Sequence, residues 1–246
     1  MKHVKFRFYE ELNDFLDKRN RRKWLEYSFL VPGSVKDAVE SFGVPHTEID
    51  LILVNGNSKK FTYKLKDRDV ISVYPVFESI DISNITRLRP KPLRNIKFVL
   101  DVHLGRLAKL LRLFGFDVSY RNDFNDDEII EISIKEKRII LTRDIGILKN
   151  KKVTRGLWVR AVYPKKQLDE IIKKLNLIKQ TKPFTRCLEC NGKLIKVNKK
   201  EILDKLDKDT LKFYNLFYKC KNCKRIYWHG SHYEKLSEIV KKYENK

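Results

Sequence analysis

The sequence predicts an α/β protein with a central parallel sheet, an N-terminal β-grasp domain and a C-terminal zinc ribbon. Short β-branched runs alternate with helical patterns between Lys97 and Leu141, an order typical of a parallel sheet with right-handed crossovers. The first 77 residues contain two strands, a helix and then further strands, and four cysteines form two Cys-x-x-Cys pairs. At 246 residues the chain is long enough for one large or two to three small domains.

Residues 1–78 are predicted to form the β-grasp, or ubiquitin-like, domain. The expected elements are strands at Lys2–Tyr9 and Trp24–Leu30, a helix capped by Ser34, and strands at Leu51–Val54 and Val70–Pro75. The turn signal Asn55-Gly56 follows the third strand. Because the chain continues past the last strand, with no free Gly-Gly tail, we expect a docking or RNA-positioning role and not carrier chemistry. We expect the isolated His3 and His46 to be surface or packing residues.

Residues 79–95 are predicted to be a basic linker. Thr86–Arg94 is interrupted by two prolines, which neither a helix nor a central strand tolerates well. Its arginines and lysines could also follow a phosphate backbone.

The central domain, residues 96–180, is predicted to place two aspartates at one edge of its sheet. Asp101 follows the strand Lys97–Leu100, and Asp144 follows the strand Arg138–Leu141. In parallel sheets ligands bind beyond the carboxyl ends of the strands, so both side chains should face one crevice. Asp117 begins its strand and should lie at the opposite edge.

Crowded carboxylates predict a site for a hard divalent cation, Mg²⁺ or Mn²⁺, which can activate a water and stabilise a phosphodiester transition state. The third ligand is expected at the start of the next helix. Asp127 is the first choice, with Asp123, Asp126 and Glu128 as alternatives. Acidic residues there could instead only complement the helix dipole.

Basic residues near this edge are candidates for binding phosphate groups. Arg106 and Arg112 lie off the apolar stripe of the helix Leu104–Phe114, although a solvated face explains such residues equally well. Arg143 precedes Asp144, and Lys149 belongs to a predicted turn with exposed basic residues over 145–152. A strand at Gly156–Val162 and a helix from Pro164 are expected to follow.

The net charge of +22 indicates a polyanionic partner, most simply nucleic acid. Residues 1–90 carry 16 basic and 13 acidic side chains, residues 91–180 carry 21 and 11, and residues 181–246 carry 17 and 8. The excess therefore lies in the second and third parts. General solubility charge is the alternative explanation.

Residues 181–246 are predicted to form a zinc ribbon with a helical insert. Four thiolates in two Cys-x-x-Cys pairs suit tetrahedral, structural Zn²⁺, and the ligands would be Cys187, Cys190, Cys220 and Cys223. Disulfides are the alternative. The 29 residues between the pairs include a helical pattern at Glu201–Phe217. Arg225, Trp228 and His232 could stack bases and bind phosphates, or belong to a strand that closes the ribbon.

Several motifs together resemble one family. They are Phe98–Arg112, Gly115–Asp117, Leu141–Asp144, Arg186–Gly192 and Tyr227–His232, with Val73–Asp81 in the N-terminal segment. The combination resembles the Mut-seven C-terminal RNase domain family, a PIN-like nuclease fold with a fused zinc ribbon, preceded by the ubiquitin-like domain of its microbial members. This resemblance implies metal-dependent RNA cleavage, with Asp101, Asp127 and Asp144 at the family's acidic positions.

The sequence thus predicts a PIN-like, metal-dependent ribonuclease acting on single-stranded or structured RNA. The alternative is a non-catalytic RNA-binding or ribosome-associated adaptor. No apolar run approaches the roughly 18–20 residues of a membrane span, and we expect a cytoplasmic protein.

Overall fold

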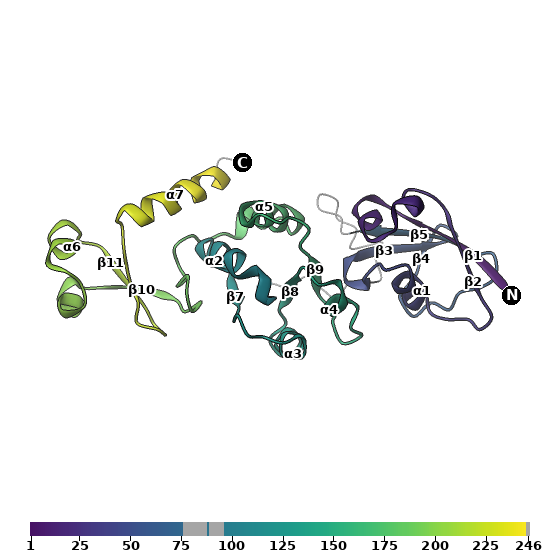
Figure 1. Ribbon diagram of the computed structural model, residues 1–246, viewed down its shortest axis with the longest axis horizontal. Coiled ribbons are helices and arrows are strands. Elements are labelled where there is room, and N and C mark those ends of the chain that lie inside the picture. The colour runs from purple at the N-terminus through teal and green to yellow at the C-terminus, as the bar shows by residue number, and fades with distance from the viewer. Residues whose placement is uncertain (76–87, 89–95, 245–246) are drawn as a thin grey trace. The chain divides into compact units, whose positions relative to one another are not determined.

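The computed structural model describes residues 1–75, 88 and 96–244 (Figure 1). By contacts the chain divides into two compact units. One contains the N-terminal residues with Asp126–Trp158, and the other contains Ile96–Asn125 with Val159 onward. The expected basic linker, 79–95, lies outside the described residues apart from Leu88. In the described part of the chain, no helix has both the length and the apolar character needed to cross a membrane.

The N-terminal residues form a five-stranded sheet in the order β2-β1-β5-β3-β4. The central strand pair, β1 and β5, is parallel, whereas β1–β2, β3–β5 and β3–β4 are antiparallel. This arrangement confirms the predicted β-grasp. Its elements are β1 (Lys2–Phe8), β2 (Leu25–Phe29), α1 (Val35–Ser41), β3 (Ile49–Val54), β4 (Asn57–Ser58) and β5 (Val70–Pro75), with short 3₁₀ helices at Glu10–Phe15, Lys18–Asn20 and His46–Glu48.

Local sequence signals account for these elements. Ser34 and Asp37 form a reciprocal capping box at the start of α1. Asn55 and Gly56 both have positive φ, 49° and 78°, which permits the tight turn between β3 and β4. Alternate residues of β1 are buried, with Phe6 and Phe8 in the domain core, so the strand carries one face of the sheet into that core.

A four-stranded sheet in the order β7-β6-β8-β9 forms the centre of the chain. β6 pairs parallel with β7, and β8 pairs parallel with β9. The α/β fold class with a parallel sheet is therefore confirmed. The strands are β6 (Lys97–Leu100), β7 (Asp117–Ser119), β8 (Ile139–Thr142) and β9 (Gly156–Trp158), and the helices are α2 (Gly105–Leu113), α3 (Asp126–Glu136), α4 (Ile145–Lys149) and α5 (Pro164–Lys174).

Gly115 ends α2 as the sequence predicts, with φ at +88°. A Cβ atom there would lie 2.1 Å from the carbonyl oxygen of Lys182, so the position also needs the absence of a side chain. This close approach brings the segment after α5 against the end of α2.

Two local predictions in the central part were wrong. Ile145–Lys149 is helix α4 and not a turn, because Asp144 caps it and Ile147 and Leu148 are buried. β9 ends at Trp158 and does not continue to Val162, because side chains of α5 bind the backbone of the following residues in place of a neighbouring strand.

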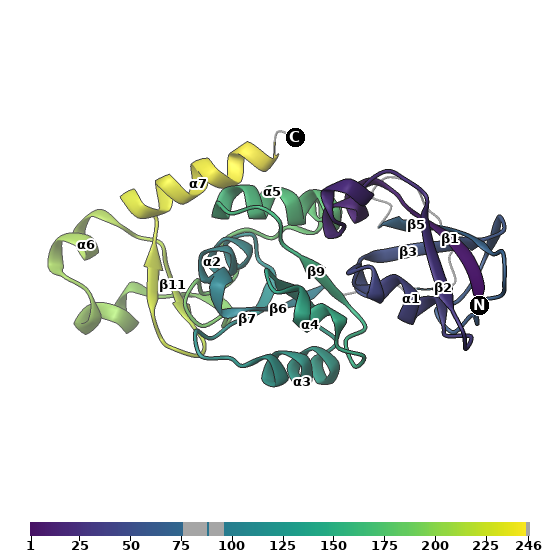
Figure 2. The ribbon, with the colours of Figure 1, turned by 45° about the vertical axis from the view of Figure 1, so that its right-hand side comes forward.

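The C-terminal residues form a three-stranded antiparallel sheet in the order β10-β11-β12. The predicted helical insert is two short helices and not one, because Leu206 is extended and Asp207 starts a new helix by accepting from Thr210 N. The elements are β10 (Leu194–Val197), a 3₁₀ helix Lys199–Lys205, α6 (Lys208–Phe213), β11 (Phe217–Cys220), β12 (Ile226–Trp228) and α7 (Ser231–Glu244). Tyr243 of α7 packs edge-on against Phe114, and Figure 2 shows α7 beside α5.

Candidate functional site

Asp101 and Asp144 each follow the end of a strand, β6 and β8 respectively. Each is the N-cap of the following helical turn: Asp101 accepts from His103 N at 3.2 Å, and Asp144 accepts from Gly146 N at 2.6 Å. Asp101 is only 4% exposed, whereas Asp144 is exposed. Both carboxylates are thus fixed in orientation by backbone N–H groups.

Asp127 is the second residue of α3 and is exposed. Asp126 starts the same helix, and Glu128 is half-buried in its first turn. Asp123 accepts from Arg121 Nε at 2.9 Å. This ion pair makes Asp123 a weaker candidate than Asp127 for the third ligand.

The basic residues expected to bind phosphate groups differ in exposure. Arg106 on α2 and Arg143 after β8 are exposed, and Lys149, the last residue of α4, is half-buried. Arg225 follows the second cysteine pair and is also exposed.

Arg112 does not have the environment expected of an RNA-binding residue. It is 3% exposed, and its guanidinium donates to Val118 O from both Nε and Nη2, at 3.2 and 2.9 Å. Nη1 donates to Leu188 O at 3.0 Å and to Glu189 O at 2.7 Å. Burial lowers the pKa of Arg112, although a guanidinium stays protonated in proteins. We therefore assign Arg112 a structural role, joining α2 and β7 to the first cysteine pair.

Among the described residues, the four cysteines form a cluster that could bind a metal ion. Their Sγ atoms lie within 4.8 Å of one another, with 3.6 Å between Cys187 and Cys223 and 3.4 Å between Cys190 and Cys220. These separations are far longer than a disulfide bond of about 2.05 Å. They are close to the roughly 3.8 Å between thiolates at 2.3 Å from a tetrahedral zinc ion, so the residues fit structural zinc.

Residues around the cysteines hold this geometry, and sequence reasoning missed most of them. The Tyr227 hydroxyl lies 3.0 Å from Cys187 Sγ, and burial raises the pKa of Tyr227. A Cβ on Gly192 would lie 2.7 Å from Cys220 Sγ, so the two cysteine pairs approach each other only with glycine there. Gly192 follows Cys190 by two residues, and this short spacing was the sequence signal that could have indicated its role.

Asp117 anchors the first cysteine pair to the start of β7. Its carboxylate accepts from Arg186 Nη2 at 3.1 Å and from Asn191 Nδ2 at 2.9 Å, while Asn191 Oδ1 accepts from Val118 N at 3.0 Å. Asp117 lies at the amino end of its strand, as predicted, and these bonds give it a structural role.

Trp228 and His232 have different surroundings. Trp228 is half-buried and packs on the small core around Phe217, as expected of a strand that closes the ribbon. His232 is exposed in the first turn of α7. His229, which is also exposed, stacks on Tyr233 with ring centroids 3.9 Å apart.

His46 is a packing residue, which confirms one of the two expected alternatives, but it is not isolated. It is 8% exposed, Nδ1 lies 2.6 Å from Glu40 Oε1, and Nε2 donates to Val153 O at 2.7 Å. Glu48, fully buried, accepts from the backbone N–H of Trp158 in β9. The β-grasp sheet domain is thus docked on the segment that contains α4 and β9.

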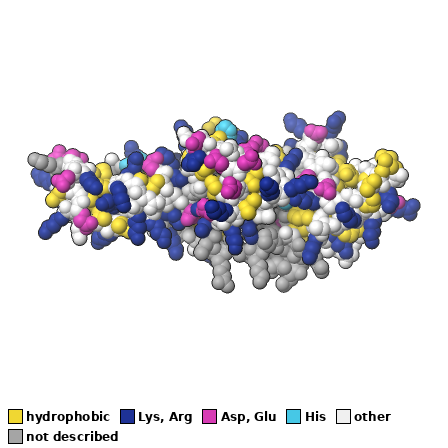
Figure 3. All heavy atoms as spheres, turned by 90° about the horizontal axis from the view of Figure 1, so that it is seen from below, with side chains coloured by type: hydrophobic (Ala, Val, Ile, Leu, Met, Phe, Trp, Pro, Cys, Tyr) yellow, Lys and Arg dark blue, Asp and Glu magenta, His cyan; other side chains and the backbone are white. Residues whose placement is uncertain are grey.

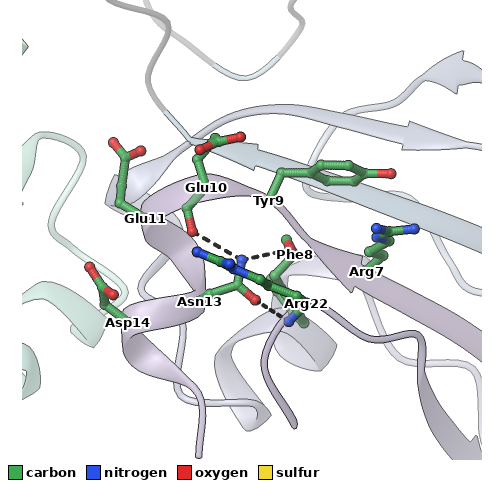
Figure 4. A pocket seen from close by; sticks show the side chains of 8 residues that line it. All are labelled: Arg7, Phe8, Tyr9, Glu10, Glu11, Asn13, Asp14 and Arg22. Carbon is green, nitrogen blue, oxygen red and sulfur yellow. Dashed lines mark hydrogen bonds between the residues drawn. The ribbon is translucent and has the colours of Figure 1, made fainter. Parts of the chain in front are cut away.

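A pocket in the β-grasp domain is lined by charges of both signs: Arg7, Arg22, Glu10, Glu11 and Asp14, with Phe8, Tyr9 and Asn13 (Figure 4). Asn13 Nδ2 donates to Phe8 O and Glu10 O, and Asn13 Oδ1 accepts from Arg22 N. These bonds shape the turn around the pocket. Figure 3 shows many Lys and Arg side chains on the surface that it draws, with Asp and Glu side chains among them.

Two family models match the chain. The Mut7-C RNAse domain matches residues 96–240, and the Mut7-C ubiquitin domain matches residues 1–81. No curated protein matches. Among solved structures, the crystal structure of H. volcanii small archaeal modifier protein 1 is 14% identical over 30% of this chain and 98% of that chain, with a TM-score of 0.25.

Proposed function

Because the chain belongs to the Mut7-C RNAse domain family, we propose that it is a metal-dependent ribonuclease that hydrolyses RNA phosphodiester bonds. The family gives the nuclease role and RNA as the substrate. The proposal adds a PIN-like catalytic domain over about 96–180 and an acidic site made by Asp101, Asp127 and Asp144, which would hold Mg²⁺ or Mn²⁺.

The strand order is the observation that carries this proposal. β6 is the neighbour of β8 in the sheet; Asp101 follows β6 directly and Asp144 follows β8 after one residue. Ligands of parallel α/β sheets bind outside the carboxyl ends of the strands. The backbone N–H groups that orient both carboxylates support their use as preformed ligands.

Each group of residues would have a separate role in the proposed reaction. A divalent ion, when bound, would polarise the scissile phosphate and activate a water for in-line attack. The aspartates would hold that ion, and the exposed Arg106 and Arg143 would pair with phosphate oxygens. The four cysteines would hold structural Zn²⁺, since all four tetrahedral positions are then filled by protein ligands. Arg225 and His232 on the ribbon would contact the RNA.

A matched pair of variants tests the acidic site. Asp101→Asn removes the charge but keeps an oxygen that accepts from His103 N, so the cap survives. We expect cleavage of a labelled RNA in Mn²⁺ to fall at least about 100-fold, with RNA affinity unchanged. A control variant, Asp204→Asn, changes an exposed carboxylate in the insert between the cysteine pairs, and this variant should cleave RNA like the wild type.

The capping bonds also favour a second candidate, a non-catalytic RNA-binding adaptor. Asp101 and Asp144 both cap helical turns, a role that needs no metal. An adaptor would bind RNA with strong salt dependence and show no cleavage in Mg²⁺ or Mn²⁺. Measuring binding and cleavage in the same samples separates the two functions.

A further inference from the structure

Two large apolar side chains are exposed to solvent in the segment between β9 and α5. Val162 is 68% exposed and Tyr163 is 75% exposed, and they are consecutive in the chain. Single exposed apolar residues are ordinary, but an adjacent valine and tyrosine at this level of exposure form a small apolar surface.

This exposure is imposed by a fixed backbone. The Glu170 carboxylate accepts from Arg160 N at 3.1 Å and from Ala161 N at 3.0 Å. The buried Gln167 donates from Nε2 to Ala161 O at 3.1 Å and to Val162 O at 3.2 Å. Both side chains belong to α5, so the helix holds the loop and directs the tyrosine outward.

The charge around Tyr163 indicates which ligand the loop suits. Lys165 and Lys166 follow it in the first turn of α5, and both are exposed. An aromatic ring next to two ammonium groups matches single-stranded nucleic acid, in which a base stacks on the ring and the phosphates meet the lysines. An apolar protein partner would gain nothing from the two lysines.

We propose that Tyr163 is a stacking platform for an unpaired base of the bound RNA, with Lys165 and Lys166 contacting the adjacent phosphates. The proposal rests on the proposed function, because it takes RNA as the ligand, and it adds a preference for unpaired nucleotides at this point. Stacking accepts any base, so the platform selects single strands and not a sequence. The loop that contains Tyr163 begins at the carboxyl end of β9, which pairs parallel with β8.

The test measures affinity for a single-stranded RNA of about 12 nucleotides and for the matching duplex, without added divalent metal. Tyr163→Ser removes the ring at an exposed position. We expect its Kd for the single strand to rise about tenfold and its Kd for the duplex to stay unchanged. Tyr163→Phe keeps the ring and should bind like the wild type. Replacing both lysines by glutamine should reduce the salt dependence of single-strand binding by a slope of about 1.4.

Two results would overturn the platform: wild-type affinity of Tyr163→Ser for the single strand, or equal weakening for single strand and duplex. The first would also be the result if the loop binds a protein instead of RNA. A wild-type protein that never cleaves RNA, combined with selective loss in Tyr163→Ser, would refute the nuclease and keep the platform. Normal cleavage with no effect of Tyr163→Ser would refute the platform alone.

Discussion

Replacement of Arg112 by methionine separates a structural role from an RNA-binding role. The substitution keeps most of the apolar volume but removes the guanidinium donors to three backbone carbonyls, those of Val118, Leu188 and Glu189. A buried acceptor left without a donor costs about 1–3 kcal/mol, and water can reach the two that are only partly buried. We expect Arg112→Met to lower the free energy of unfolding by about 3–5 kcal/mol.

Thermal unfolding followed by circular dichroism provides the measurement. A loss of this size should lower the unfolding midpoint by roughly 10 °C for a chain of this length. Arg106→Met is the matched control, because Arg106 lies on the same helix and is exposed; its effect should stay within about 0.5 kcal/mol. If Arg112→Met melts like the wild type but binds RNA more weakly, the structural assignment is wrong.

Three further predictions concern the fold and the cysteines. Gly115→Ala should destabilise the chain by more than about 2 kcal/mol, because the added Cβ would meet Lys182 O at a position with positive φ. Gly33→Ala is the control and should not have this effect, because no atom lies within 4 Å of its added carbon. Urea unfolding of the two variants measures the difference. His46→Phe should cost about 1–3 kcal/mol by leaving Val153 O without its donor, so an unchanged urea midpoint would contradict this contact. Purified protein should contain about one zinc ion per chain, and a chelator should remove this ion and make the zinc ribbon sensitive to protease. If elemental analysis finds no zinc in the purified protein, the proposed zinc site is wrong.

Elements with strong local signals could be predicted from the sequence. Ser34, Asn55-Gly56 and Gly115 each fixed a helix start, a turn or a helix end where the structure has one. The motif resemblance was confirmed by the family-model matches, and the cysteine spacing correctly predicted a metal-competent cluster.

Interactions between distant residues explain the errors. Arg112 lies off the apolar stripe of its helix, a position typical of solvated residues, but two of its three acceptors are 76 and 77 residues away. The strand expected to reach Val162 ends early because Glu170 and Gln167 bind its backbone, and no local pattern encodes that competition. The contact between His46 and Val153 spans 107 residues. The acidic site formed by Asp101, Asp127 and Asp144 stays a prediction.

The most direct test of the central claim is single-turnover cleavage of a labelled single-stranded RNA by Asp144→Asn in Mn²⁺, with affinity measured in the same samples. Asparagine retains the oxygen that accepts from Gly146 N, so helix α4 keeps its cap. The account predicts wild-type affinity with cleavage reduced at least about 100-fold. Cleavage at the wild-type rate by a correctly folded Asp144→Asn would contradict the proposed acidic site.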